Sequence, residues 1–245
     1  MSLPFALATR ALDTILARQQ SLGLAEVGSP YRELRSPMSP APVGTMRVWQ
    51  GDGEISRMVY VGLVVPPINL DSHMVFAFTA SRSGVPHFTL DSVHGGAYYA
   101  YHLDLIPRAE LSSHLSYMDS AYHPLTGLYE EASQREGLSR AHIGPRQHAL
   151  MSPWMLVHRA DEAAFQGMTP IVEAYVAHWL ELVSAGLPAP VIESLADTDL
   201  AARDGTVRAN LFSPEVDPVW AQVSRLLGEP ASDEIRDVLM GGPLT

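Results

Sequence analysis

The sequence contains no cysteine and no lysine, and its sixteen basic residues are all arginine. Without cysteine there is no disulfide, no thiolate nucleophile, no zinc–cysteine site and no cysteine-ligated iron–sulfur cluster. Without lysine the chain cannot form a Schiff base or a Walker-type phosphate loop. Several common classes of enzyme are thereby excluded.

Long apolar runs and net positive charge are also missing. No run reaches the roughly 18–20 apolar residues that a membrane-spanning helix needs. The first 20 residues carry Asp13 in an amphipathic pattern, which does not fit a signal peptide, so we expect a cytoplasmic protein. The net charge of −11 argues against nucleic acid as the main partner.

The order of periodic segments predicts an α+β fold, a sheet with helices packed on its faces, in a single domain over residues 1–245. We expect residues 1–44 to form a helix and a loop, 45–107 the sheet, and 108–230 a mainly helical region. Short connections between the strand-like runs predict an antiparallel meander. The expected strands are 45–50, 56–65, 72–79, 86–93 and 97–105.

Helical periodicity dominates the second half of the chain. We expect helices over 109–136, with a break near His123-Pro124, then a loop over 137–150 and an amphipathic helix around 172–183. Residues 191–212 and 214–227 also read as helical. Within the first of these, Arg203-Asp204-Gly205-Thr206-Val207-Arg208 is expected to form a charged break.

Asp91 is the first candidate for chemistry. The turn signals Ser83-Gly84 and Gly95-Gly96 bound the strand that carries it, and the two-residue period of a strand places His87, Thr89 and Asp91 on one face. Burial among apolar side chains favours the protonated form of a carboxylic acid, which can donate a proton. The alternative is a solvent-facing aspartate at the end of a strand.

Two further groups of residues each allow two interpretations. His73, His87, His94 and His102 lie within thirty residues, so a metal site on adjacent strands is conceivable, although hydrogen-bonded neutral histidines are the commoner arrangement. The segment around Asp204 and Arg208 is either an exposed turn or a cover over a pocket, in which Arg208 pairs with an anion. No GxSxG elbow or HExxH helix is present.

Several segments, taken in order over about residues 55–228, resemble the ferredoxin-dependent bilin reductase family, which includes red chlorophyll catabolite reductase. They are Ser72-His73-Met74-Val75-Phe76, Val85-Pro86-His87-Phe88-Thr89-Leu90-Asp91, Tyr101-His102-Leu103-Asp104-Leu105-Ile106-Pro107, Ser152-Pro153-Trp154-Met155-Leu156-Val157-His158-Arg159 and the segment from Arg203 to Arg208. The resemblance implies a three-layer α/β/α sandwich with a central antiparallel sheet. It also implies that a linear tetrapyrrole, such as biliverdin or a chlorophyll catabolite, lies between the sheet and the C-terminal helices.

The same resemblance implies a radical mechanism without a bound cofactor or metal. Reduced ferredoxin supplies single electrons, and pocket carboxylates supply protons. The implied catalytic residues are Asp91, Asp204 and His73. The implied substrate-binding residues are His87, Ser152, Trp154, Arg159 and Arg208.

The chain also departs from the family pattern. In the strand before His73, where phycocyanobilin-forming members have a glutamate, it has Val61-Gly62-Leu63-Val64, which argues against a four-electron vinyl reduction. Its acidity requires a local basic patch for an acidic ferredoxin, and Arg135, Arg140, Arg146 and Arg159 could supply one. Two rival functions stay open: a non-catalytic tetrapyrrole carrier, and a metal-dependent oxygenase or hydrolase built on the His87, Asp91 and His102 region.

Overall fold

The structure, a computed structural model, describes residues 1–244, and within them one nine-stranded antiparallel sheet lies between two layers of helices. The strands are β1 (Ala25–Glu26), β2 (Arg32–Leu34), β3 (Gly44–Gln50), β4 (Ile55–Val65), β5 (Leu70–Thr79), β6 (His87–Gly95), β7 (Tyr98–Ile106), β8 (Leu138–Arg140) and β9 (Leu156–Ala160). The helices are α1 (Leu3–Leu16), α2 (Leu115–Ala121), α3 (Thr126–Gln134), α4 (Pro145–His148), α5 (Glu162–Gly167), α6 (Thr169–Ala185), α7 (Ala189–Ser194), α8 (Leu200–Leu211), α9 (Val219–Leu227) and α10 (Glu229–Met240), and short 3-10 turns cover Pro66–Ile68 and His123–Leu125.

The sheet is a meander extended at both edges. Strands β3 to β7 follow one another in space as in sequence, β9 and then β8 lie beside β7, and both β1 and β2 pair with β3. The expected meander over 45–105 is therefore confirmed, with strand ends shifted by one or two residues. Strand β4 is buried on both faces, so it reads as a nearly continuous apolar run.

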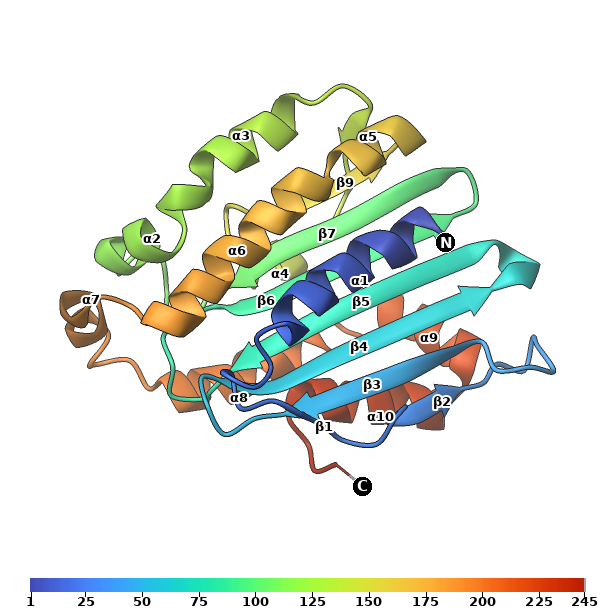
Figure 1. Cartoon of the computed structure of the whole chain (residues 1–245), viewed down its shortest axis with the longest axis horizontal. Helices are drawn as coiled ribbons and strands as arrows, with labels where there is room; N and C mark the ends of the chain where they lie inside the picture. The colour runs from blue at the N-terminus through green and yellow to red at the C-terminus, as the bar shows by residue number, and fades with distance from the viewer. Residues whose placement is uncertain (245) are drawn as a thin grey trace.

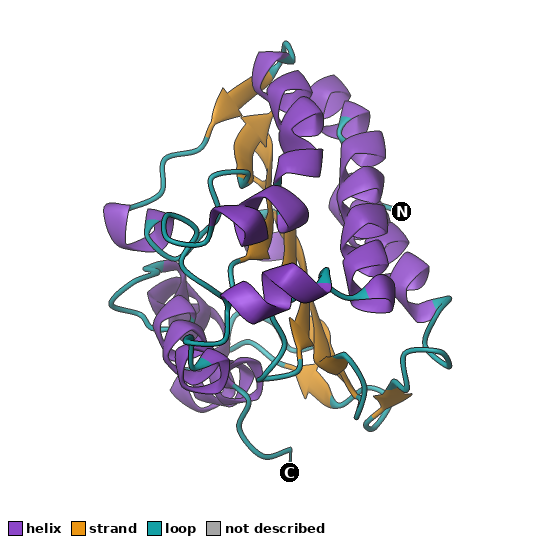
Figure 2. Cartoon of the chain, turned by 90° about the vertical axis from the view of Figure 1, so that its left-hand side faces the viewer, coloured by secondary structure: helices purple, strands orange, loops and turns teal. Residues whose placement is uncertain are grey.

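The two faces of the sheet carry different layers. We call the face toward α1 and α6 the first face, and the face toward α8, α9 and α10 the second face; Figure 1 shows α1 and α6 in front of the sheet and the C-terminal helices behind it. Seen from the side, the strands form a thin layer between the two groups of helices (Figure 2). Each layer has its own apolar core: Trp179 and Phe88 lie in the first, and Phe76, Phe212 and Trp220 in the second. The expected three-layer sandwich is confirmed.

Two expectations about the second half are wrong. Residues 137–150 are not only a loop, because they contain β8 and α4. The segment from Arg203 to Arg208 is not a break, since it lies inside α8. The chain breaks earlier, between α7 and α8, where the Asp199 side chain accepts a hydrogen bond from Ala202 N at 3.0 Å and caps the new helix. Gly205 is exposed in mid-helix, where one glycine costs only about 1 kcal/mol.

Candidate functional site

A small cavity lies between the second face of the sheet and the C-terminal helices. Cross-strand register places Met74, Asp91 and His102 in one row over β5, β6 and β7, so their side chains share this face. The cavity has a volume of about 70 Å³ and is mostly apolar. Its lining includes Met74, Phe76, Phe212, Trp220, Asp91 and His102.

Asp91 and His102 face each other across the β6–β7 hairpin. The Oδ2 atom of Asp91 lies 3.9 Å from Nδ1 of His102, an ion-pair distance about 1 Å longer than a hydrogen bond. Within residues 1–244, Asp91 Oδ1 and His102 Nε2 are buried and have no hydrogen-bond partner. Buried polar atoms are normally paired, so two unpaired atoms at one cavity make it a candidate site for a ligand with polar groups.

A second carboxylate reaches the cavity from the opposite layer. Asp217 lies in the connection between α8 and α9 and lines the same cavity. Burial raises its pKa above the ordinary value, the charge of Asp91 acts in the same direction, and the hydrogen bond from Val219 N opposes them. For His102, burial alone would lower the pKa, but Asp91, Asp104 and Asp217 outweigh burial and raise it. Both pKa values are therefore shifted upward, toward the protonated form of each group.

Asp104 is buried two residues further along β7 and fixes the neighbouring loop. Its carboxylate accepts hydrogen bonds from Ser152 Oγ at 2.5 Å, Ser152 N at 2.8 Å and Leu105 N at 2.9 Å. Burial raises the pKa of Asp104 to about 6, while His102 and these donors act in the opposite direction. Ser152 was expected to bind substrate, but in this structure its polar groups hold Asp104.

His87 lines the cavity and is hydrogen-bonded to Asp204, which does not line it; both side chains are buried and fully paired. Thr79 N donates to His87 Nδ1 at 3.0 Å, so the ring proton is on Nε2, which donates to Asp204 Oδ1 at 2.7 Å. Burial lowers the pKa of His87 to about 4, so its ring is neutral. Burial raises the pKa of Asp204, but the hydrogen bond from His87 and the charges of Arg108 and Arg208 outweigh it, and the net direction is down.

Asp204 is therefore an ionised structural acceptor, and the structure does not bring it into the cavity lining beside Asp91. Arg108 lies 3.4 Å from the same carboxylate oxygen and donates to Thr79 Oγ1. Arg208 packs over the Phe78 ring at 3.9 Å. It also donates from Nε and Nη2 to Leu239 O, so its guanidinium ties α8 to α10.

Two expected site residues lie on the first face, away from the cavity. His73 pairs with Ser92 in the register and contacts Phe5 of α1, with Tyr60 Oη 2.8 Å from Nδ1 and Asp71 Oδ1 2.6 Å from Nε2. The His73 side chain does not share the cavity face with Asp91, because residues 73 and 91 are one step out of phase across β5 and β6. Trp154 stacks on Tyr122 and donates to Thr126 Oγ1, so it packs between β9 and α3.

Arg159 lies at the outer end of the second face, where its guanidinium is exposed and can bind a ligand. It pairs with Ala100 in the register, which is two residues from His102 along β7. Its exposed guanidinium lies 4.5 Å from the Tyr98 ring centre. An exposed cation in this position suits the carboxylate of a ligand that extends out of the cavity.

From the sequence, Asp217 was not assigned to the site, and His102 was considered only as a metal ligand. Asp217 precedes Pro218 at a helix start, which reads as an ordinary cap and gives no sign of burial. The pairing of His102 with Asp91 depends on where the hairpin turns: a turn at Gly95-Gly96 would place Asp91 opposite Ala100. The actual turn is Gly96-Ala97, with Gly96 at φ +66°, and it places Asp91 opposite His102.

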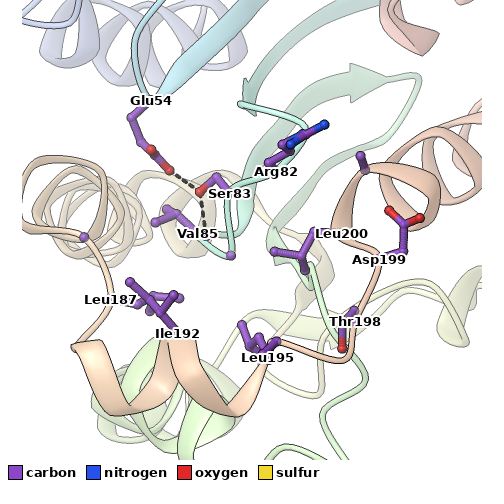
Figure 3. A pocket seen from close by; sticks show the side chains of 14 residues that line it. Glu54, Arg82, Ser83, Val85, Leu187, Ile192, Leu195, Thr198, Asp199 and Leu200 are labelled. Carbon is purple, nitrogen blue, oxygen red and sulfur yellow. Dashed lines mark hydrogen bonds between the residues drawn. The ribbon is translucent and has the colours of Figure 1, made fainter.

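A larger hollow of about 630 Å³ lies elsewhere, between the β5–β6 connection and the α7–α8 region. Figure 3 shows Glu54 and Arg82 on one side of it and Leu187, Ile192 and Leu195 on the other. Ser83 Oγ is hydrogen-bonded to Glu54 there. Its lining shares no residue with the first cavity and offers no buried, unpaired acid or base, so the smaller cavity is the better candidate site.

Neither a metal site nor a membrane segment is found in the part of the chain that the structure describes. Over residues 1–244 no three His, Asp or Glu side chains are arranged to hold a metal ion. In the same range no helix combines the length and the apolar character needed to cross a membrane.

The comparison with solved structures bears on the fold. Phytochromobilin synthase from tomato, solved in complex with biliverdin, matches 95% of this chain and 83% of its own with a TM-score of 0.71. The two chains share one fold. Their sequences are 15% identical. No protein-family model and no curated protein sequence matches the chain. The segments that resemble bilin reductases thus lie on the fold of phytochromobilin synthase.

Proposed function

We propose that this protein reduces a linear tetrapyrrole bound between the second face of the sheet and the C-terminal helices, with Asp91 as a proton donor. One observation carries the proposal. The fold matches an enzyme solved with biliverdin, and the largely apolar cavity beneath the C-terminal helices has a carboxylate and an imidazole with unpaired buried atoms. An apolar pocket with a few convergent polar groups and perturbed pKa values is typical of an active site.

The chemistry requires acids but no chain-borne redox group. Each electron added to the conjugated tetrapyrrole raises its basicity, and a nearby acid then protonates it. Asp91 lies on the sheet side of the cavity and Asp217 on the helix side, so a planar ligand between them would have an acid on each face. We assign the second donor role to Asp217, because Asp204 is held ionised by His87 and two arginines.

The ligand needs more room than the cavity offers in this conformation. Ligand sites usually enclose about 300–1,000 Å³, whereas this cavity holds about 70 Å³. The C-terminal layer must therefore move away from the sheet when a tetrapyrrole enters. Arg159 would then lie near the ligand edge and pair with a propionate, and His87 would form part of the floor.

The electron donor in this proposal is reduced ferredoxin. Ferredoxin passes one electron at a time, which suits a substrate that is itself the electron acceptor. The proposed reaction adds one proton from a pocket acid for each electron, so the enzyme returns to its starting state once the acids are reprotonated from solvent. Biliverdin and chlorophyll catabolites share the open-chain tetrapyrrole chemistry that the cavity would take.

The proposal is tested by anaerobic titration with biliverdin, followed by addition of reduced ferredoxin, with visible absorbance as the readout. The wild-type protein is expected to perturb the biliverdin spectrum and then to bleach or shift it on reduction. Asp91→Asn should keep the binding step and slow reduction by about 100-fold or more, because the amide has no acidic proton to give. Asp119→Asn, on the exposed side of α2, is the matched control and should behave as wild type.

The outcomes separate the rival functions. Binding without any spectral change on reduction would point to a carrier and contradict the proposed reaction. Wild-type turnover by Asp91→Asn would remove Asp91 from the mechanism. If the wild-type protein binds neither biliverdin nor a chlorophyll catabolite, the function is not the one proposed.

A further inference from the structure

His102 has a place in the fold that no packing role explains. It lies on β7 directly opposite Asp91 and lines the cavity, and its side chain is 17% exposed. Its Nδ1 faces the Asp91 carboxylate at 3.9 Å, while its Nε2 is buried without a partner among residues 1–244. Histidines with structural roles, such as His87, have both ring nitrogens hydrogen-bonded.

The charged groups that act on His102 are all acidic. Asp91 comes from β6, Asp104 from β7 and Asp217 from the α8–α9 connection. The other neighbours carry no charge: Val157 on β9, paired with His102 in the register, Met151, and Thr89 on β6. His87, which also lines the cavity, is neutral and hydrogen-bonded to Asp204. A cationic imidazole is the form that three carboxylates favour.

We propose that His102 holds the proton that Asp91 delivers, so that the two side chains act as one acid with His102 as the reservoir. The inference rests on the proposed function, because it concerns how the pocket acid of that reaction is recharged. It adds a residue to which neither the sequence motifs nor the fold comparison assigns a role.

Before transfer, the proton is on Nδ1 of the His102 imidazolium and Asp91 is a carboxylate. The Asp91 carboxylate takes this proton as the N–H bond breaks, and His102 becomes neutral. The substrate then takes one electron from the donor and the proton from Asp91, whose O–H bond breaks as the new bond on the substrate forms, so Asp91 returns to a carboxylate. A proton from solvent restores the imidazolium before the next electron arrives. The Nε2–H group meanwhile supplies a hydrogen bond to a polar atom of the ligand, which gives this buried donor a partner.

The discriminating variant is His102→Gln, which keeps a hydrogen-bonding side chain but cannot carry a proton. With biliverdin and reduced ferredoxin, we expect binding within about twofold of wild type and single-turnover reduction about 100-fold slower. The wild-type rate should fall as pH rises and the imidazolium loses its proton, whereas the His102→Gln rate should be low and nearly independent of pH. His94→Gln, at the outer end of β6 where His94 stacks on Tyr99, is the control and should keep the wild-type profile.

A second measurement needs no substrate. The imidazole of His102 is titrated by NMR and identified by its absence in His102→Gln. Its midpoint should lie above the ordinary histidine value of about 6.5 and should fall in Asp91→Asn. A midpoint at or below the ordinary value, or one that Asp91→Asn leaves unchanged, would overturn the inference.

The two measurements distinguish the two failures. If wild-type protein does not reduce biliverdin, the proposed function fails, and the titration by itself decides whether His102 is the charged partner of Asp91. If wild-type protein reduces biliverdin and His102→Gln does so at the same rate and with the same pH profile, the proposed function stands and the role of His102 is refuted.

Discussion

Two sets of ionisable side chains share the second face of the sheet, and they differ in how completely they are paired. His87, Asp204 and Arg108 satisfy one another in a buried network, which fixes both the tautomer of His87 and the charge of Asp204. Asp91 and His102 keep buried atoms without partners. A saturated network stabilises a fold, whereas unpaired buried acids and bases are available to a ligand. This difference is the reason for proposing a structural role for the first set and a role in chemistry for the second.

Replacing Asp204 by asparagine tests the structural assignment. We expect the free energy of unfolding at pH 7 to fall by about 3–5 kcal/mol, because the change leaves buried arginines without their counter-charge. The pKa of Asp204 is lowered in the folded state, so its stabilisation is present above the ordinary pKa of about 3.9 and is lost as pH falls through the lower folded value. Urea unfolding at pH 7 and pH 3 should therefore show a smaller difference from wild type at the lower pH.

Asp199→Asn is the matched control on the same helix, since asparagine caps a helix about as well as aspartate and the expected change is a few tenths of a kcal/mol. If Asp204→Asn proved as stable as the wild-type protein at pH 7, the buried network would not contribute the expected 3–5 kcal/mol, roughly, to the free energy of unfolding.

At the level of individual residues, the sequence identified part of the candidate site. The strand period correctly grouped Asp91 with His87, because alternation on one strand depends only on local geometry. Whether His73 shares their face depends on the register between strands, and that register is set by the β5–β6 connection. Asp217 is half-buried because helices pack against a distant sheet face, and no local pattern encodes that packing.

Among the elements, α9 and the connection that precedes it close the cavity. Phe212 meets Phe76 and Trp220 edge to face, with ring centres 5.5 and 6.0 Å apart, so an aromatic contact holds the layer to the sheet. Helix α9 buries Trp220, Leu226 and Leu227 among its nine residues, whereas α6 buries eight of its seventeen. Fewer buried contacts mean a lower cost of local opening, so α9 is the element expected to move.

Hydrogen exchange followed by mass spectrometry tests whether α9 opens more readily than α6. In the free protein, amides of residues 219–227 should exchange at least about tenfold faster than those of residues 169–185, because opening α9 disrupts less apolar packing. Biliverdin should slow exchange in 219–227 and leave 169–185 unchanged. Equal protection of both helices, with or without ligand, would mean that the cavity opens in some other way.

Over the whole molecule, the sequence predicted the centre of the fold better than its edges. Strands β3 to β7 are joined by short turns and buried on at least one face, so local patterning is enough to find them. The short strands β1, β2, β8 and β9 pair across connections longer than a hairpin turn, and β8 has only three residues. The helix break was misplaced because a capping aspartate, Asp199, sets the start of α8 more strongly than one exposed glycine disturbs it.

Charge is distributed unevenly over the molecule. Residues 138–159, which form β8, α4 and β9 at one edge of the sheet, contain three arginines and three histidines and no acidic residue, although the chain has a net charge of −11. Arg140, Arg146 and Arg159 are exposed. We call residues 138–159 the basic edge. An acidic electron donor is expected to approach here, where the field of the chain is least repulsive.

Reversing the charges of Arg140 and Arg146 should weaken the encounter between reduced ferredoxin and the basic edge. In Arg140→Glu/Arg146→Glu, electron transfer from reduced ferredoxin at low ionic strength should slow by about 10–100-fold, because like charges then meet at the docking surface. The deficit should shrink as salt screens the interaction. The control Arg18→Glu/Arg225→Glu changes the net charge equally at exposed positions on α9 and just beyond α1. Stopped-flow absorbance of bound biliverdin gives both rates. Equal slowing in the two variants would show that overall charge governs the encounter, whereas loss in the first variant alone would locate the donor at the basic edge.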